Sequence, residues 1–539
     1  MKKLKKSSFI EGAFIATSCI IITKILGIIY VIPFYKIIGE QGGILYGYAY
    51  NIYNIFLILS SAGIPLAISK LTSEYNTLGL KKEKKRMYEL TSKIILVFSS
   101  IAFLICFIFA PQLSNIIIGS LEGGNTIEDV TFVIRLISFS LLIIPFLSIE
   151  RGYLQGHQYI LEPSISQVIE QIVRIAIILI GSYTFTYVFK LPIKYAVGIS
   201  TFAAFIGGLV TFFYLHKTIK RNKNQIGLNE KVEPNKKMDK EIVKKVITYS
   251  LPFIIINLAH NLYISTDMIL IIRTLPQLGF SAMDTEFIGS VFTTWGAKFD
   301  TIIISIQTGI IISLIPCIVK NYVENNMEEV NNNFNKCLKI ILLIIAPLAV
   351  YLSGMSKSLW SLFYGPSVYG PKIIKYTLLV AIFMSLYMAI NSLMQSLNKT
   401  KLTYISVFSG LIANLILDVP LMKQFSKMNI PAYYGAIAAT FIGFFISNTI
   451  NLVYLHKKMN FEYKETVKIF PRFIISIIIL LFLGKLFNTI LPIDSSSKMM
   501  QLLNLVVSGL ISGGIYLAIN YKNIKEILPD KIKKSLKLK

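Results

Sequence analysis

The stretch SCIIITKILGIIYVIPF, residues 18–34, is an apolar run with a single lysine, Lys24, near its middle. A transmembrane helix needs about 20 mostly apolar residues to cross a hydrocarbon core about 30 Å thick. Comparable runs recur along all 539 residues, of which 54% are hydrophobic and only 15% charged, and the mean hydropathy is +0.63. The sequence therefore predicts an all-α polytopic membrane protein, and this composition excludes most soluble enzymes.

The apolar runs predict about 14 transmembrane helices. The expected spans are residues 9–34, 44–69, 90–113, 130–150, 164–189, 193–216, 246–275, 287–319, 336–354, 373–396, 402–422, 432–455, 469–491 and 499–521. The first run follows MKKLKKSSF and has no small-residue cleavage site, so we interpret it as an uncleaved first span.

The formal net charge of +26 arises from 54 Lys and Arg against 28 Asp and Glu. Most basic residues lie in short stretches between apolar runs, such as KKEKKR at 81–86 and the tail at 522–539, where they set membrane orientation. This distribution argues against nucleic-acid binding. It predicts a multi-pass membrane protein with both termini in the cytoplasm, and the Lys-, Ile- and Asn-rich residue usage suggests a low-GC bacterium and hence a bacterial plasma membrane.

A polar stretch at 217–241 divides the chain near its middle. A weak internal repeat supports this division, because the run GYLQGHQ at 152–158 is echoed by SLMQSLN at 392–398, 240 residues later. Duplicated bundles flanking a central pathway are common in transporters. We therefore expect two six-helix lobes around a central cavity. The predicted parts are an N-terminal lobe at 1–216, a cytoplasmic linker at 217–245, a C-terminal lobe at 246–456, and two extra helices with a basic tail at 457–539.

The sequence contains no recognisable motif for catalysis or cofactor binding. There is no Walker loop, no HExxH and no GxSxG, and the four cysteines lack the spacing of a zinc site or a disulfide framework. These patterns favour a carrier over an enzyme, without a cofactor or a bound metal. The sequence does not say whether Na⁺ or H⁺ is coupled to transport.

Charged residues inside membrane spans are costly and are candidates for function. Lys24 lies too deep in its span for its ammonium group to reach water easily, which favours a cavity-facing role. Glu170 and Arg174 are spaced i, i+4 and can pair on one helix face, either as a self-neutralised pair or as part of a cavity.

Two later spans carry further polar side chains. Asn257, His260 and Asn261 fall roughly on one face of the span at 246–275, and Asp267 follows as a candidate ion-coupling residue. In the next span Lys298 and Asp300 are two residues apart, so each is expected to find a partner on another helix. Asp418, near the end of the span at 402–422, is interpreted as interfacial.

Several of these stretches resemble a known family. They are the runs TKILG at 23–27, ILYGY at 44–48, LSSAGIPLAISK at 59–70, ERGYLQG at 150–156 and SQVIEQIVR at 166–174. The chain is similar to the SpoVB/YtgP branch of the polysaccharide exporters. That branch belongs to the multidrug/oligosaccharidyl-lipid/polysaccharide exporter superfamily, which also includes the MurJ-type lipid II flippases.

The resemblance implies alternating access by two lobes and a lipid-tail groove formed by the last two helices. It also implies an undecaprenyl-pyrophosphate-linked sugar as substrate, most simply lipid II for peptidoglycan synthesis. Relatives carry basic residues in the first two helices, and Lys24 matches the first of these positions. Tyr30 and Leu57 stand at the other two, which leaves Lys24 as the main anion-binding residue, with Arg174 and Lys298 as candidate helpers.

The expected partners are the lipid-linked sugar and the bilayer, and cell-wall synthesis proteins are further candidates; the chain is expected to be a monomer. An inside-negative membrane potential favours outward movement of an anion, so flipping needs no nucleotide. Three alternatives stay open: a cation-coupled multidrug exporter of the same superfamily, an exporter of another undecaprenyl-linked polysaccharide unit, and a scaffold that transports nothing.

Overall fold

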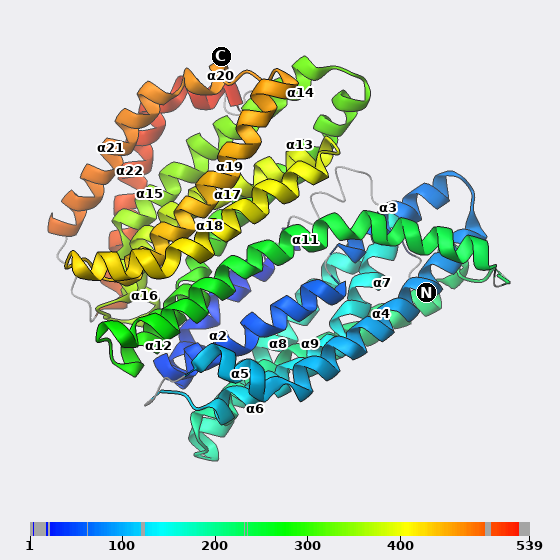
Figure 1. Ribbon diagram of the computed structural model, residues 1–539, viewed down its shortest axis with the longest axis horizontal. Coiled ribbons are helices and arrows are strands. Elements are labelled where there is room, and N and C mark those ends of the chain that lie inside the picture. Colours follow the sequence, from blue (N-terminus) through cyan, green and yellow to red (C-terminus); the bar gives the residue numbers. More distant parts are fainter. Residues whose placement is uncertain are drawn as a thin grey trace. The chain divides into compact units, whose positions relative to one another are not determined.

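The computed structural model describes Leu4 and residues 18–19, 22–61, 63–119, 124–230, 232–233, 235–490 and 497–527. Within these residues the secondary structure is helical and contains no strand, as the sequence predicted (Figure 1). The chain divides into two compact units, Met1–Thr293 and Thr294–Lys539.

The first unit begins with a helical segment at residues 22–29, which meets α2 at an angle of 46°. Its helices are α2 (Val31–Ser61), α3 (Ile64–Thr77), α4 (Lys81–Ile108), α5 (Ala110–Ile118), α6 (Ile127–Ser138), η1 (Phe139–Leu142), α7 (Ile144–Gly156), α8 (Leu161–Tyr183), η2 (Thr184–Val188), α9 (Ile193–Arg221), α10 (Lys223–Ile226), α11 (Lys236–Thr274), η3 (Pro276–Leu278) and α12 (Ala282–Ser290). Helix α8 pairs with α9, α3 pairs with α7, and α11 packs along α2, α3 and α4.

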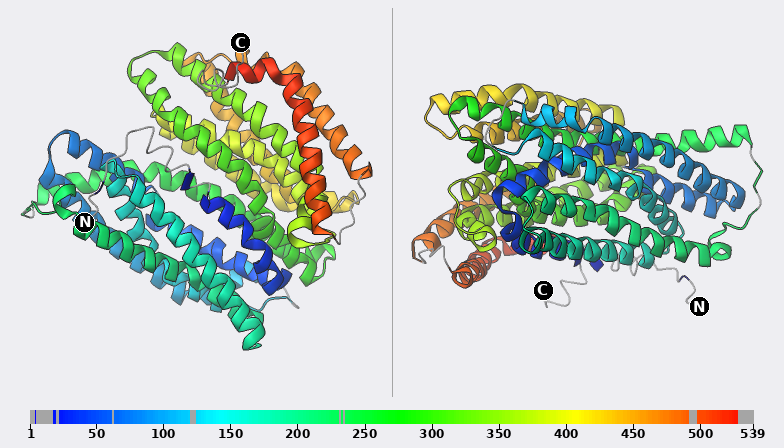
Figure 2. Two further views of the ribbon diagram at one scale, coloured as in Figure 1. Left: turned by 180° about the vertical axis from the view of Figure 1, so that it is seen from behind. Right: turned by 90° about the horizontal axis from the view of Figure 1, so that it is seen from below.

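The π-helical turn η4 (Val291–Trp295) leads into the second unit. Its helices are α13 (Ala297–Val323), α14 (Met327–Ile340), η5 (Ile341–Ile345), α15 (Ala346–Gly354), α16 (Ser356–Tyr364), α17 (Gly370–Ser396), α18 (Thr400–Lys427), α19 (Tyr433–Met459), α20 (Lys464–Val467), α21 (Phe470–Ile490) and α22 (Lys498–Ile527). Helices α18 and α19 form a long antiparallel pair, and α21 and α22, orange and red in Figure 2, lie side by side.

Within the described residues, 11 helices are long and apolar enough to cross a membrane, or up to 12 when the bent segment at 22–29 and α2 count as one span. The expected count of 14 is therefore not confirmed, although the multi-pass architecture is. One cause lies in α2, which runs through the expected gap between the first two spans. Gly39 interrupts its helical path with φ 66° and ψ −165°, a conformation open essentially to glycine alone.

The weak repeat in the sequence corresponds to a repeat in the backbone. Helices α7 and α17 both end in a left-handed residue, Gln158 with φ 66° and Asn398 with φ 56°. In each turn the following residue donates its N–H to a carbonyl five residues earlier, at 3.0 and 2.8 Å. Gly79 and Asn325 are likewise left-handed, two residues before α4 and α14. The two halves of the chain therefore share these two turns.

The division at Thr293/Thr294 falls inside the span that the sequence placed at 287–319. Helices α11 and α12 belong to the first unit, because α11 contacts α2, α3, α4 and α5. The predicted lobes at 1–216 and 246–456, with their linker and C-terminal helices, stay a prediction about the parts that move during transport.

Candidate substrate site in the membrane helices

Lys24 lies on the helical segment at 22–29 and its side chain is exposed. Gly27 follows one turn later, and a Cβ atom at Gly27 would lie 3.4 Å from Nε2 of Gln171 on α8. Because residues at i and i+3 share a helix face, Lys24 lies on the side of its helix that faces α8. The side chain of Gln171 therefore lies beside the helix that carries Lys24.

Glu170 and Arg174 lie on α8 but take different partners. Glu170 forms an ion pair with Arg151 of α7, with 2.8 Å between Oε2 and the guanidinium. Arg151 also donates to the hydroxyl of Ser166 at 2.9 Å. The i, i+4 pairing that the sequence allowed is thus replaced by a pair between helices, because Arg151 approaches Glu170 from the neighbouring helix α7.

Arg174 instead donates to the side-chain oxygen of Gln171. The hydroxyls of Tyr30, Tyr46 and Tyr50 lie close enough to its guanidinium to interact electrostatically. The rings of Tyr46 and Tyr50 are in contact, with 4.4 Å between centroids. Arg174 is therefore a half-buried cation that lies near three tyrosine hydroxyls and in electrostatic range of Glu170, and its partner Gln171 also lies against the helix that carries Lys24.

The position of Tyr30 bears on the departure from the family pattern. Tyr30, which the resemblance places at a position expected to be basic, is buried with 6% of its surface exposed. Its hydroxyl lies in electrostatic range of Arg174, so a positive charge from α8 lies near Tyr30. Sequence spacing alone could not show this, because the two residues are far apart in the chain.

The polar residues of α11 form hydrogen bonds within their own helix and with α2. Asn257 and Asn261 donate their side-chain amides to carbonyls one turn earlier, at 2.8 and 3.1 Å. Ser265 donates to Oδ1 of Asn51 on α2 at 2.8 Å. Nδ1 of His260 is buried and has no hydrogen-bond partner among the residues that the structure describes.

Asp267 is also on α11 and only 7% of its surface is exposed. Lys298 and Asp300 belong to the second unit, on α13. Asp300 accepts a hydrogen bond of 3.4 Å from Thr377 on α17, so it finds a partner on another helix, as expected. The sequence candidates thus form a cluster around α8, a polar face on α11, and a separate pair on α13.

Asp418, for which the sequence suggested an interfacial position, is buried within the protein. It lies on α18 with 0% of its surface exposed, as does Asn414 one turn earlier. Asn414 donates to the hydroxyl of Thr440 on α19 at 3.1 Å. A fully buried carboxylate beside amide and hydroxyl oxygens offers the hard ligands that a small cation prefers. No cluster of three or more His, Cys, Asp or Glu exists among the described residues, so a transition-metal site is not indicated there.

A second buried carboxylate, Glu286 on α12, was not anticipated. It is 2% exposed and accepts hydrogen bonds from the backbone N–H and side-chain amide of Asn125, at 2.9 and 3.0 Å. Tyr48 of α2 donates to it at 3.5 Å. These bonds join three elements of the first unit, so Glu286 is a structural residue whose partners only the fold brings together.

The chain is similar to proteins of known family. A family model described as "Polysaccharide biosynthesis protein" matches residues 9–321, and the MatE model matches residues 252–419. Lipid II flippase MurJ of Bacillus subtilis is 30% identical over 531 residues, which cover 96% of this chain and 95% of the relative. Stage V sporulation protein B of the same organism is 25% identical over 418 residues, 75% of this chain and 78% of that protein.

Solved structures agree on the fold. The inward closed conformation of lipid II flippase MurJ superposes with a TM-score of 0.64 at 16% identity, covering 94% of this chain and 99% of that one. An inward-facing multidrug resistance MATE transporter superposes with a TM-score of 0.62 at 14% identity, covering 83% and 98%.

Proposed function

The chain belongs to the MurJ-like branch of the polysaccharide biosynthesis proteins, and from this premise we propose that it flips a lipid-linked sugar, most simply lipid II, across the plasma membrane. Flipping proceeds by alternating access, in which the cavity between two lobes opens first to one face and then to the other. The chain acts as a carrier and not as an enzyme. Both termini lie in the cytoplasm, and it works as a monomer that hands its substrate to cell-wall synthesis.

The observation that carries this proposal is the pair of cationic helices in the first unit. Lys24 and Arg174 lie on helices that meet at Gln171, within the membrane-spanning part of the chain. A cation in a low-dielectric site attracts a pyrophosphate strongly, and guanidinium groups add directed hydrogen bonds. Lys24 and Arg174 bind the pyrophosphate, and Lys298 on α13 is a further candidate for contact with the substrate.

The polar faces of α11 and α13 contribute to the same function. The amides of Asn257 and Asn261 and the imidazole of His260 supply neutral hydrogen-bonding groups for the sugar, and Asp300 does so from α13. Glu170 holds Arg151 and so positions the start of α8. The buried carboxylates of Asp267 and Asp418 are the candidates for coupling to Na⁺ or H⁺.

The decisive experiment reconstitutes the full chain in liposomes that carry fluorescent lipid II in the inner leaflet. The expected result is that wild-type protein moves the lipid to the outer leaflet, whereas the Lys24→Ala/Arg174→Ala double variant does not. Outer-leaflet lipid II in depleted cells should fall in parallel. Unchanged outer-leaflet lipid II on depletion, with no flipping in liposomes, would show that lipid II is not the substrate.

A second candidate function is cation-coupled multidrug export, which the MatE match at residues 252–419 favours. Such a carrier needs an acidic group for a cationic drug, and Asp267, Asp300 and Glu170 are available. Resistance to cationic drugs on overexpression, without a cell-wall defect on depletion, would support this function over lipid flipping.

A further inference from the structure

Helices α3 and α7 touch along two glycines and then separate around a cavity. A Cβ atom at Gly152 would lie 2.5 Å from the carbonyl of Pro65, and one at Gly156 would lie 2.5 Å from the carbonyl of Ser69. Because the two glycines have no side chains, the backbones of α3 and α7 can approach closely over one turn. Helix α7 ends at Gly156, whereas α3 continues for two more turns, to Thr77.

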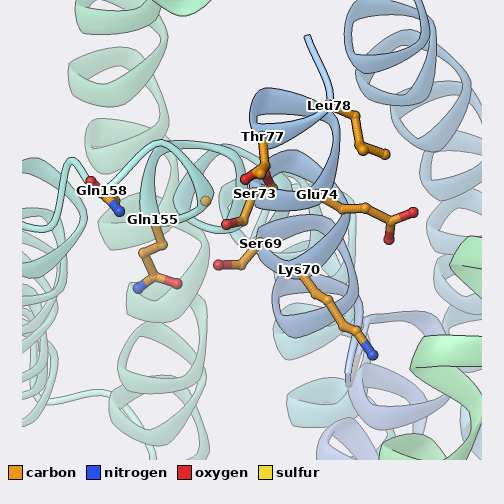
Figure 3. Close-up of a pocket in the computed structure, with 9 residues that line it drawn as sticks. Ser69, Lys70, Ser73, Glu74, Thr77, Leu78, Gln155 and Gln158 are labelled. Carbon is orange, nitrogen blue, oxygen red and sulfur yellow. The ribbon is translucent and has the colours of Figure 1, made fainter. Parts of the chain in front are cut away.

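The space beside this extension of α3 is a cavity of about 620 Å³. This lies within the range of about 300–1,000 Å³ that small-molecule sites occupy. Its lining residues are Ser69, Lys70, Ser73, Glu74, Thr77, Leu78, Gln155, Gly156 and Gln158 (Figure 3). All belong to the first unit.

The wall of the cavity carries neutral hydrogen-bonding groups. Ser69, Ser73 and Thr77 recur every four residues, so they lie along one face of α3. Figure 3 shows the hydroxyls of Ser69 and Ser73 directed toward the side of α3 where Gln155 lies. Among the described residues, no partner exists for the side-chain amides of Gln155 and Gln158. Hydroxyls and primary amides donate and accept at once, which suits ligands rich in hydroxyl and acetamido groups.

The two charged lining residues are occupied elsewhere. Glu74 forms an ion pair of 2.8 Å with Lys245 of α11, and the ammonium of Lys70 lies 4.0 Å from the ring centroid of Tyr249 on the same helix. In Figure 3 both side chains extend away from Gln155. The cavity therefore has little net charge to offer an anion, and this distinguishes it from the site of Lys24 and Arg174.

Hydrogen bonds of His157 and Lys84 stabilise the turn at residues 155–158, which carries Gln155 and Gln158. His157 is 5% exposed, with Nδ1 2.8 Å from the carbonyl of Tyr153 and Nε2 3.0 Å from the ammonium of Lys84. Since an ammonium only donates, Nε2 is the acceptor and Nδ1 carries the proton. Lys84 also donates to Asn76 at 2.6 Å. These bonds fix residues 155–158 relative to α3 and α4, so the polar wall is formed in advance of any ligand.

We propose that the α3–α7 cavity binds the carbohydrate portion of the lipid-linked substrate at the predicted cytoplasmic face. The inference rests on the proposed function and adds a second contact for the substrate, in which sugar hydroxyl and acetamido groups bond with Ser73 and Gln155. Two lining residues of the cavity, Glu74 and Lys70, contact α11. A sugar bound in the cavity would therefore lie beside a helix of the predicted C-terminal lobe.

The test uses the purified full-length chain and the disaccharide di-N-acetylchitobiose, with inorganic pyrophosphate as a second probe. Ligand-observed NMR titrations should show disaccharide binding to wild type that Gln155→Leu weakens about tenfold, the effect of losing one or two hydrogen bonds. The same exchange at Gln112, an exposed residue of α5 outside the cavity, serves as control and should leave the affinity unchanged.

A labelling experiment locates the binding. In a background without the four native cysteines, maleimide should modify Ser73→Cys more slowly when the disaccharide is present, whereas Asn224→Cys on α10 should be unaffected. Equal affinities for wild type and Gln155→Leu, or no protection of Ser73→Cys, would overturn the inference. Protection by pyrophosphate in place of the disaccharide would overturn it too, since the cavity would then be an anion site.

The lipid II flipping assay on the same preparations separates this inference from the proposed function. If wild type flips lipid II but the disaccharide does not bind, the cavity assignment is wrong and the proposed function stands. If wild type flips no undecaprenyl-linked sugar, the proposed function is wrong, and site-specific disaccharide binding then supports a carbohydrate site that serves another substrate.

Discussion

At the scale of single residues, the first unit carries two candidate anion-binding cations, Lys24 on the segment at 22–29 and Arg174 on α8. Arg174 donates to Gln171 and lies among three tyrosines, whereas Glu170 is engaged with Arg151. Glu170 lies in electrostatic range of Arg174, but its carboxylate is ion-paired with Arg151, so the guanidinium of Arg174 retains part of its attraction for an anion. This arrangement makes Arg174 the strongest single candidate for contact with a pyrophosphate.

We expect Arg174→Ala to lower the rate of lipid II flipping at least tenfold, because a charge-assisted hydrogen bond contributes about 1.5–3 kcal/mol. Arg174→Lys should restore part of the rate, since the charge returns without the planar fork. The rate is measured in liposomes at matched protein content. Arg135→Ala, at an arginine of α6 bonded to the carbonyl of Phe107, is the control; an equal loss there would show that any membrane arginine is needed and would contradict the specific role.

Asp418 gives a second prediction at this scale. Asp418→Asn keeps the size of the side chain but removes the charge at a position with 0% exposure. We expect flipping by this variant to become independent of the Na⁺ and H⁺ gradients that affect wild type. The measurement is the flipping rate in liposomes with each gradient imposed in turn. If Asp267→Asn removes the dependence and Asp418→Asn does not, the coupling carboxylate lies on α11 instead.

At the scale of elements, close helix contacts depend on glycines. Helix α3 contacts α7 at Gly152, where an added Cβ atom would clash with the carbonyl of Pro65. Helix α18 contacts α19 at Gly435, where a Cβ atom would lie 2.3 Å from the backbone nitrogen of Met422. Lipid-filled surroundings provide no hydrophobic drive between helices, so such backbone contacts and their packing hold the pairs together.

Gly152→Ala should therefore destabilise the protein by about 1–3 kcal/mol, the usual cost of forcing extra atoms into a packed contact. The expected result is a lower midpoint of thermal unfolding in detergent. Gly513→Ala on α22 is the matched control, because no atom lies within 4 Å of a Cβ there. We expect this variant to be unchanged or slightly more stable, since alanine favours a helix over glycine. Equal midpoints for the two variants would show that the glycine contact does not limit stability.

At the scale of the whole molecule, the direction of transport follows from charge and membrane potential. The pyrophosphate of an undecaprenyl-linked sugar is anionic, and an inside-negative potential favours its outward movement by about 2.3 kcal/mol per charge per 100 mV. We therefore propose that the membrane potential drives this movement without a nucleotide.

We expect an imposed inside-negative potential to raise the initial flipping rate in liposomes, and an inside-positive potential to lower it. The potential is set with potassium gradients and valinomycin, and the same gradients without valinomycin are the control. Rates that do not respond to the potential would show that net charge does not move across the membrane field in the rate-limiting step.

The helical membrane class, the succession of apolar spans and the repeat around Gln155 and Gln395 could be read from the sequence. Each depends on composition or local spacing, and the backbone turns at Gln158 and Asn398 follow from residues adjacent in the chain. The family membership was likewise predictable, because motifs such as ERGYLQG at 150–156 are contiguous. The number of spans was not, since a helix that bends or continues through a short gap leaves no clear mark in hydropathy.

The partners of the charged residues were decided only by the tertiary structure. Glu170 pairs with Arg151, Asp418 is fully buried, and Glu286 accepts from Asn125 and Tyr48. The physical reason is the same in each case. Hydropathy and helical spacing describe one helix at a time, whereas the energy of a charge in a membrane protein depends on which other helices surround it, and that is fixed by packing between residues far apart in the chain.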